Sequence, residues 1–123
     1  MVWWVMAGGA VGTGARYLIG LWTLDRLGAG FPYATLIVNL SGCFMLGVVT
    51  HLAAVPVGSV ELRASVAIGL LGGFTTYSAF NQETLAMLSQ GSAGAALLNV
   101  AITVVGGLAA GWLGLVLARQ LVT

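Results

Sequence analysis

The sequence predicts an all-α membrane protein with four transmembrane helices in a single domain (residues 1–123), and three observations lead to that prediction. Only 6% of the 123 residues are charged, against about 25% in soluble domains. Three long stretches, 27–60, 64–82 and 84–118, carry no charged residue, and a membrane helix needs roughly 20 apolar residues. These stretches do not alternate as barrel strands do. We therefore expect a multi-pass protein of the cell membrane.

Turn signals divide the chain into helices at about 3–24, 33–54, 60–89 and 93–119. A charged, glycine-rich turn over 25–30 separates the first two, and Pro32 suits the first turn of the second. The stretch 56–59, which begins with Pro56, ends the second helix. Ser59, with Glu61 nearby, begins the third helix. Residues 90–92 (Gln-Gly-Ser) form the turn before the fourth helix.

The third helix contains a sequence that does not favour a continuous helix. Gly72 and Gly73 are followed by Thr75 and Thr76 in the middle of the span, and helices kink or break at such glycine-rich steps. Unwound backbone at membrane depth survives only where it is buried or lines a cavity. We therefore expect a break near Gly72–Thr76, whose freed carbonyl groups could hold a cation, as in transporters with discontinuous helices.

Two polar residues lie in the first two helices. Arg16 follows a glycine-rich stretch in the first helix; its permanent charge must reach water, an anion or a carboxylate. It either snorkels to the membrane interface or serves the function of the protein. Asn39 lies in the first third of the second helix, where an interhelical hydrogen bond is the simplest interpretation. A polar residue within a membrane helix is also a candidate functional residue.

Further polar and aromatic residues share faces of the third and fourth helices. Tyr77, Phe80 and Glu83 follow one another at intervals of three, beyond the expected break. Asn99 and Thr103 are four apart on the fourth helix and therefore stack on one side of it. This second pair is typical either of a hydrogen-bonding track for a small solute or of a cross-link between helices.

The charge distribution predicts how the chain inserts. The net charge is +1, with no lysine and four scattered arginines, so nucleic-acid binding has no electrostatic basis. Arg63 and Arg119 lie on one side of the predicted membrane and Arg26 on the other, which leaves the positive-inside rule almost no bias. We therefore expect insertion in both orientations and an antiparallel homodimer. Small residues four apart suggest close helix packing without locating that interface: Gly8 and Gly12, Gly69 and Gly73, Gly107 and Gly111.

Three stretches together resemble the CrcB/Fluc fluoride channels. Residues 8–17 read Gly-Gly-Ala-Val-Gly-Thr-Gly-Ala-Arg-Tyr, residues 34–42 read Ala-Thr-Leu-Ile-Val-Asn-Leu-Ser-Gly, and residues 72–80 read Gly-Gly-Phe-Thr-Thr-Tyr-Ser-Ala-Phe. The order of the motifs, the length and the four spans agree with that family, so the resemblance covers essentially the whole chain. Two residues depart from its pattern: Tyr77 replaces a phenylalanine and Ala79 replaces a threonine or serine. These changes affect the expected rate of ion passage more than the assignment to the family.

The resemblance implies a function and an assembly. Members of that family are fluoride-specific channels that export cytoplasmic fluoride passively and protect against its toxicity. They are dual-topology antiparallel homodimers with two pores. A structural sodium ion lies at the dimer centre, held by carbonyl groups that correspond to Gly72 and Thr75. The implied pore residues are Asn39, Tyr77, Ser78, Phe80, Asn99 and Thr103, with Arg16 and Glu83 in vestibule or supporting positions.

Three other classes agree less well with the residues. A small multidrug exporter has the same four-helix antiparallel architecture, but it needs a carboxylate within helix one, where this chain has Arg16 and no acid before Asp25. A non-transporting assembly subunit has no reason to combine a broken helix with an ordered polar face. An enzyme is the least favoured, because His51 is the lone histidine and has no nucleophile or metal set around it.

Overall fold

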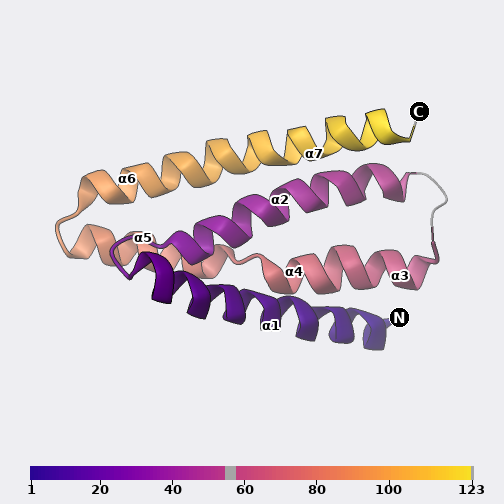
Figure 1. The fold of residues 1–123 in the computed structure, drawn as a ribbon, viewed down its shortest axis with the longest axis horizontal. Helices are drawn as coiled ribbons and strands as arrows, with labels where there is room; N and C mark the ends of the chain where they lie inside the picture. Colours follow the sequence, from indigo (N-terminus) through magenta and orange to yellow (C-terminus); the bar gives the residue numbers. More distant parts are fainter. Residues whose placement is uncertain (55–57, 123) are drawn as a thin grey trace.

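The computed structural model describes residues 1–54 and 58–122, and all regular structure in these ranges is helical. Four helical stretches run roughly side by side, and both termini lie at the same end (Figure 1). The third and fourth stretches are subdivided, because η1 and η2 have the wider π-helical winding. The elements in order are α1 (Val2–Leu27), α2 (Tyr33–Ala53), α3 (Val60–Ala64), η1 (Ser65–Leu70), α4 (Leu71–Phe74), α5 (Tyr77–Ser89), α6 (Ala93–Ala101), η2 (Ile102–Gly106) and α7 (Gly107–Leu121).

The helix ends follow local chemistry, with one correction to the predicted boundaries. Asp25 and Arg26 are expected in a turn, but they lie in the last turn of α1, whose C-cap residue Gly28 has a φ of +76°. A cation near a helix C-terminus is favourable, and glycine accepts a positive φ without strain. The third stretch begins after Ser59 as expected, and the Ser59 side chain caps α3 by accepting a hydrogen bond from Leu62 N at 3.1 Å. The predicted breaker Pro56 lies outside the described residues.

The helices pack in two closely spaced pairs. α1 lies along η1 and α4, and α2 runs parallel to α7. A Cβ atom added at Gly12 would overlap the carbonyl of Leu70, and one added at Gly114 would overlap the carbonyl of Phe44. The small residues thus let helix backbones approach closely, as is common in lipid. The spaced glycines Gly8 and Gly73 have the same role within this one chain.

Apolar side chains lie mostly on the outside of the described chain. Trp3, Leu108 and Ile68 are 76%, 73% and 65% exposed, whereas Asn99 and Thr23 are each only 2% exposed. A soluble domain buries large apolar residues and exposes polar ones. The opposite arrangement here is that of a protein surrounded by lipid or by further protein.

Two described helical stretches, Tyr33–Ala53 and Ala93–Leu121, are long and apolar enough to cross a membrane. Only 11% and 6% of their most apolar windows are buried within the chain, so they are not core helices of a soluble fold. α1 carries Arg16, and the third stretch is interrupted. That α1 and the third stretch also cross the membrane stays a prediction, and so does the full count of four spans.

Candidate functional site

The third helical stretch is interrupted by two extended residues. Thr75 has φ, ψ of −86°, 155° and Thr76 has −151°, 110°, between the end of α4 and the start of α5. We call Thr75 and Thr76 the helix interruption. Here the regular ladder of backbone hydrogen bonds stops, so the polar backbone groups must find other partners. The interruption is therefore the point around which the candidate site is built.

Asn39 supplies two of those partners from α2. Its Nδ2 donates to the carbonyl of Thr76 at 3.0 Å, and the backbone N–H of Thr76 donates to Asn39 Oδ1 at 2.7 Å. The primary amide matches an extended peptide group, since it offers a donor and an acceptor side by side. One N–H of the amide group remains available. Asn39 thus fixes the extended backbone and keeps one donor for another ligand.

The residue after the interruption starts a new helix. Thr76 caps α5 by accepting a hydrogen bond from Ala79 N at 3.2 Å, and its hydroxyl lies 3.2 Å from Ser78 Oγ. The first turn of a helix has backbone N–H groups without helical partners, and the helix dipole makes this end favourable for an anion. The interruption therefore places a helix N-terminus beside two hydroxyl groups.

The carbonyl groups before the interruption divide into bonded and unbonded ones. Arg16 Nε donates to the carbonyl of Gly73 at 3.1 Å, and Thr75 Oγ1 donates to that of Leu71 at 2.9 Å. Within the described chain, no hydrogen bond reaches the carbonyl oxygens of Gly72 and Thr75. A Cβ added at Gly72 would meet no atom within 4 Å. Oxygen donors of this kind suit a hard cation, so the two predicted sodium ligands fit that ion chemically.

Arg16 faces a cavity of about 420 Å³ between α1, α2 and α5. Its side chain is half-buried, and no carboxylate lies within 4 Å of it among the described residues. Thr35, Thr76 and Glu83 line the same cavity. The arginine thus links α1 to α4 just before the interruption, and it contributes a positive charge to this cavity.

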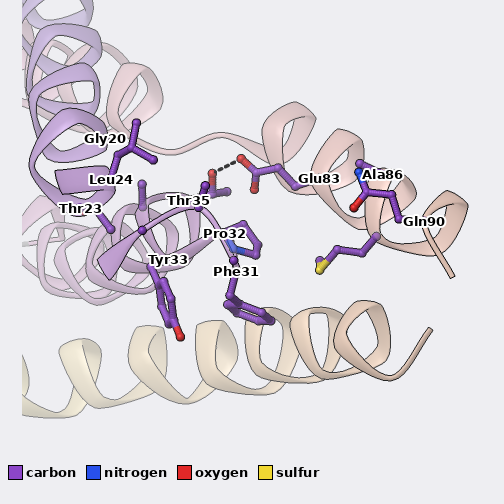
Figure 2. Close-up of a pocket in the computed structure, with 15 residues that line it drawn as sticks. Gly20, Thr23, Leu24, Phe31, Pro32, Tyr33, Thr35, Glu83, Ala86 and Gln90 are labelled. Carbon is purple, nitrogen blue, oxygen red and sulfur yellow. Dashed lines mark hydrogen bonds between the residues drawn. The ribbon is translucent and has the colours of Figure 1, made fainter. Parts of the chain in front are cut away.

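Glu83 lies between two cavities. Its Oε1 accepts a hydrogen bond from Thr35 Oγ1 at 2.7 Å (Figure 2). Its Oε2 is buried and has no hydrogen-bond partner in the described structure. The second cavity, of about 370 Å³, lies beneath the loop that joins α1 to α2. The carboxylate therefore has one satisfied and one unsatisfied oxygen.

The two predicted pore aromatics are neighbours with different surroundings. The ring centroids of Tyr77 and Phe80 are 5.7 Å apart, with planes tilted by 58°. Tyr77 is 78% exposed, whereas Phe80 is 8% exposed. The structure brings the two rings together, but in a single chain only the ring of Tyr77 is exposed. Ser78 is exposed beside it.

The pair expected on the fourth helix separates into two environments. Asn99 is buried on α6, and its Nδ2 donates to Thr84 Oγ1 at 3.0 Å. Thr84 in turn donates to the carbonyl of Phe80 at 2.7 Å. Thr103 lies half-buried on η2, where the winding changes. In the single chain Asn99 thus links α6 to α5.

Sequence reasoning overlooked Thr35 and Thr84 as partners of the site. Thr35 is four residues before Asn39, and Thr84 is four residues after Phe80. Residues four apart lie on the same face of a helix, so this spacing was the signal that could have identified both.

Comparison with known proteins identifies the family. The sequence profile described as "CrcB-like protein, Camphor Resistance (CrcB)" matches residues 3–115. The chain belongs to the CrcB family. Proteins named "Fluoride-specific ion channel FluC" are 49% identical in Sorangium cellulosum, over 97% of this chain and 94% of that protein, and 44% identical in Thermus thermophilus, over 96% and 93%. One in Anaeromyxobacter dehalogenans is 47% identical over 95% and 94%. Together with its apolar exterior, this membership makes the chain a membrane protein and not an enzyme.

Proposed function

We propose that this protein is a fluoride-specific ion channel of the cell membrane that lets cytoplasmic fluoride leave passively, down its electrochemical gradient. The supporting observation is the helix interruption at Thr75 and Thr76, held by Asn39, in a chain that aligns almost end to end with curated fluoride channels. By this export the protein protects the cell against fluoride that enters as neutral HF and dissociates inside.

The residues around the interruption supply what a small, strongly hydrated anion needs. Arg16 raises the local anion concentration in its cavity, as charged clefts do. The second amide N–H of Asn39, the hydroxyl of Ser78 and the first turn of α5 offer hydrogen bonds that replace water. The positive ring edges of Tyr77 and Phe80 attract the ion without holding it as tightly as a fixed cation. Passage requires binding that is weak enough for release.

The functional unit in this proposal is an antiparallel homodimer with two pores. The exposed ring of Tyr77 and the open surface at Gly72 support it, since both lack covering atoms in one chain. The second subunit would complete each pore and bring Asn99 and Thr103 of the fourth helix near the path. The nearly balanced arginines permit both orientations in the membrane.

A structural sodium ion is the proposed cofactor at the centre of this dimer. The carbonyl oxygens of Gly72 and Thr75 from each subunit would hold it, four oxygens in all. When bound, the ion compensates carbonyl groups that the interruption leaves without donors. Within one chain, Arg16 and Asn39 donate hydrogen bonds to the neighbouring carbonyls of Gly73 and Thr76, whereas those of Gly72 and Thr75 receive none.

Efflux from liposomes tests the function directly. The purified protein is reconstituted with internal fluoride, and external fluoride is followed with an electrode beside a parallel chloride measurement. We expect rapid fluoride loss with little chloride loss. Tyr77→Phe and Ala79→Thr restore the family pattern and should maintain or raise the rate. If neither the protein nor this double variant releases fluoride from well-reconstituted vesicles, the proposal is wrong.

A further inference from the structure

An apolar groove runs along the seam between α2 and α7, which lie side by side (Figure 1). We call it the seam groove. It measures about 340 Å³ and is lined by residues of α2 from Cys43 to Thr50 and by residues of α7 from Gly107 to Leu115, which is about two turns of each helix. No residue of the third helical stretch lines it. The seam groove is therefore separate from the helix interruption and from the proposed path of the anion.

Glycines that contact the neighbouring helix of the same chain create this groove. A Cβ added at Gly47 would overlap the carbonyl of Gly111, and one added at Gly111 would lie 3.5 Å from the carbonyl of Cys43. Small residues of this kind let two helix backbones approach closely in lipid. Here that approach takes place within one chain, so these glycines are not left over for a second copy. The side chains of Leu108 and Trp112, which also line the groove, are exposed.

The seam groove offers an occupant few polar groups. The hydroxyl group in its lining belongs to Thr50, and its Oγ1 already donates to the carbonyl of Leu46 at 2.7 Å. Neither α2 nor α7 contains an acidic residue. A bound water needs two to four polar partners, which this lining does not provide. The groove therefore favours an apolar occupant, and no negative charge on its two helices repels an anionic group nearby.

Arg119 lies one helical turn beyond the end of the seam groove. It follows Leu115, the last residue of α7 that lines the groove, by four positions. Its guanidinium carbon lies 5.8 Å from the centre of the Trp112 ring, so the charge is directed back towards the groove, as side chains on a helix point towards its N-terminus. Among the described residues, no carboxylate pairs with it. A permanent charge of this kind at the edge of an apolar surface favours an anion, and the planar guanidinium group matches the geometry of a phosphate.

We propose that the seam groove binds an anionic phospholipid, with one acyl chain along the groove and the phosphate group at Arg119. Such a lipid combines in one molecule the two chemistries that the surface presents, an apolar groove and an arginine without a carboxylate partner. Trp112 lies between them, and tryptophan is enriched at the depth of the lipid headgroups. A flexible acyl chain fits a groove whose glycines are already used within the chain better than a second helix does.

Quenching of Trp112 fluorescence by brominated phospholipids tests this site without reference to fluoride. The changes Trp3→Phe, Trp4→Phe and Trp22→Phe leave Trp112 as the only tryptophan of the full chain. The purified protein in detergent is titrated with phosphatidylglycerol, which is anionic, or with phosphatidylcholine, which has no net charge, both brominated on the acyl chains. We expect saturable quenching by both lipids. The half-saturating fraction should be about fivefold lower for phosphatidylglycerol, the effect expected of one arginine beside anionic lipid.

Three variants separate the charge from the groove. Arg119→Gln should remove the fivefold preference, and Arg119→Lys, which keeps the charge, should retain most of it. Arg63→Gln is the matched control and should leave the preference unchanged, because α3 lies at the same end of the molecule as the end of α7 but does not line the groove (Figure 1). Gly111→Leu places a side chain in the groove and should raise the half-saturating fraction of both lipids severalfold.

Several results would overturn the proposal. These are quenching that does not saturate, a preference that survives Arg119→Gln or falls equally in Arg63→Gln, and unchanged half-saturation in Gly111→Leu. If neither lipid quenches Trp112 in a protein that light scattering shows to be dimeric, a second copy covers the groove and the proposal is wrong. If Gly111→Leu does not fold, the Arg119 series decides by itself. If the single-tryptophan chain does not fold, native mass spectrometry of the unaltered protein and of Arg119→Gln measures the same preference.

Discussion

At the scale of single residues, Asn39 has the strictest geometric requirement, because its side chain must satisfy two backbone groups of another helical stretch. Its amide group bonds both polar groups of the Thr76 peptide at 3.0 and 2.7 Å, from a helix 37 residues away in sequence. In a low-dielectric environment these groups have no water to replace a lost partner. The conformation of the helix interruption therefore depends on one side chain of another helix.

Asn39→Ala should remove both hydrogen bonds and leave the Thr76 peptide unsatisfied. A buried group without its partner costs about 1–3 kcal/mol, so we expect a clear fall in the melting temperature of the detergent-solubilised protein and loss of fluoride efflux. Asn39→Asp keeps the acceptor for Thr76 N–H but places an acceptor against the Thr76 carbonyl, and it should also reduce efflux. Unchanged melting of the alanine variant would show that the interruption is maintained by other contacts.

The buried pair of Asn99 and Thr84 offers a double-mutant cycle. Each single change, Asn99→Leu or Thr84→Val, leaves the other side chain without its 3.0 Å partner. We expect each to destabilise, and the double variant to be less destabilised than the sum, with a coupling of about 0.6 kcal/mol as for other membrane helix pairs. Melting temperatures of the four proteins measure it. Strictly additive effects would mean that the pair does not interact in the membrane.

At the scale of elements, close backbone contact decides the packing of α1 against η1 and α4. A Cβ at Gly12 would overlap the carbonyl of Leu70, whereas one at Gly14, two residues on, would meet nothing within 4 Å. The helix thus presents one tightly packed face and one open face within a single turn. Spacing alone identified small residues but not which helix they contact, because the partner depends on how the chain folds back.

Gly12→Ala and Gly14→Ala form a matched pair that tests this packing. Gly12→Ala should destabilise by about 1–3 kcal/mol, because the backbones must move apart. Gly14→Ala should be neutral or stabilise by up to about 1 kcal/mol, because alanine favours a helix. Thermal melting in detergent compares them. Equal effects of the two changes would contradict the close approach of α1 to Leu70.

At the scale of the whole molecule, one chain leaves the face of the interruption uncovered. Gly72 has open space where a Cβ would be, and Tyr77 is 78% exposed. Glycine in a helix lowers stability by roughly 0.5–1 kcal/mol relative to alanine, and nothing within the described chain requires it at Gly72. A second subunit approaching this surface is a physical reason for it.

Gly72→Leu therefore tests the dimer. We expect the variant chain to fold but to lose most of its dimer population, since the new side chain projects into the proposed subunit contact. Light scattering on the purified protein, or disappearance of a cross-linked dimer band, measures this. Gly94→Leu is the control, because Gly94 also has nothing within 4 Å but lies in the first turn of α6. A Gly72→Leu variant that stays dimeric would exclude this surface from the interface.

Much of this architecture follows from the linear pattern of residues. The apolar, almost uncharged stretches predict membrane helices because burying charge in lipid is costly. Local signals placed the helix starts at Tyr33, Val60 and Ala93 within a residue, and glycine and threonine at 72–76 predicted where extended residues occur. The end of α1 was misplaced by three residues, because Asp25 and Arg26 are compatible with both a turn and a last helical turn.

Which polar groups meet depends on how the helices pack against one another. Nothing in the linear order shows that Asn39 bonds Thr76, that Arg16 reaches Gly73, or that Asn99 is satisfied by Thr84. These pairs depend on the relative rotation and depth of neighbouring helices, which the close glycine contacts and the π-helical segments η1 and η2 set. The membrane environment and the positions of the helices follow from the linear order of residues, because hydrophobicity and turn chemistry act locally. The hydrogen-bond partners come from the packing, because they join residues 15 to 57 positions apart.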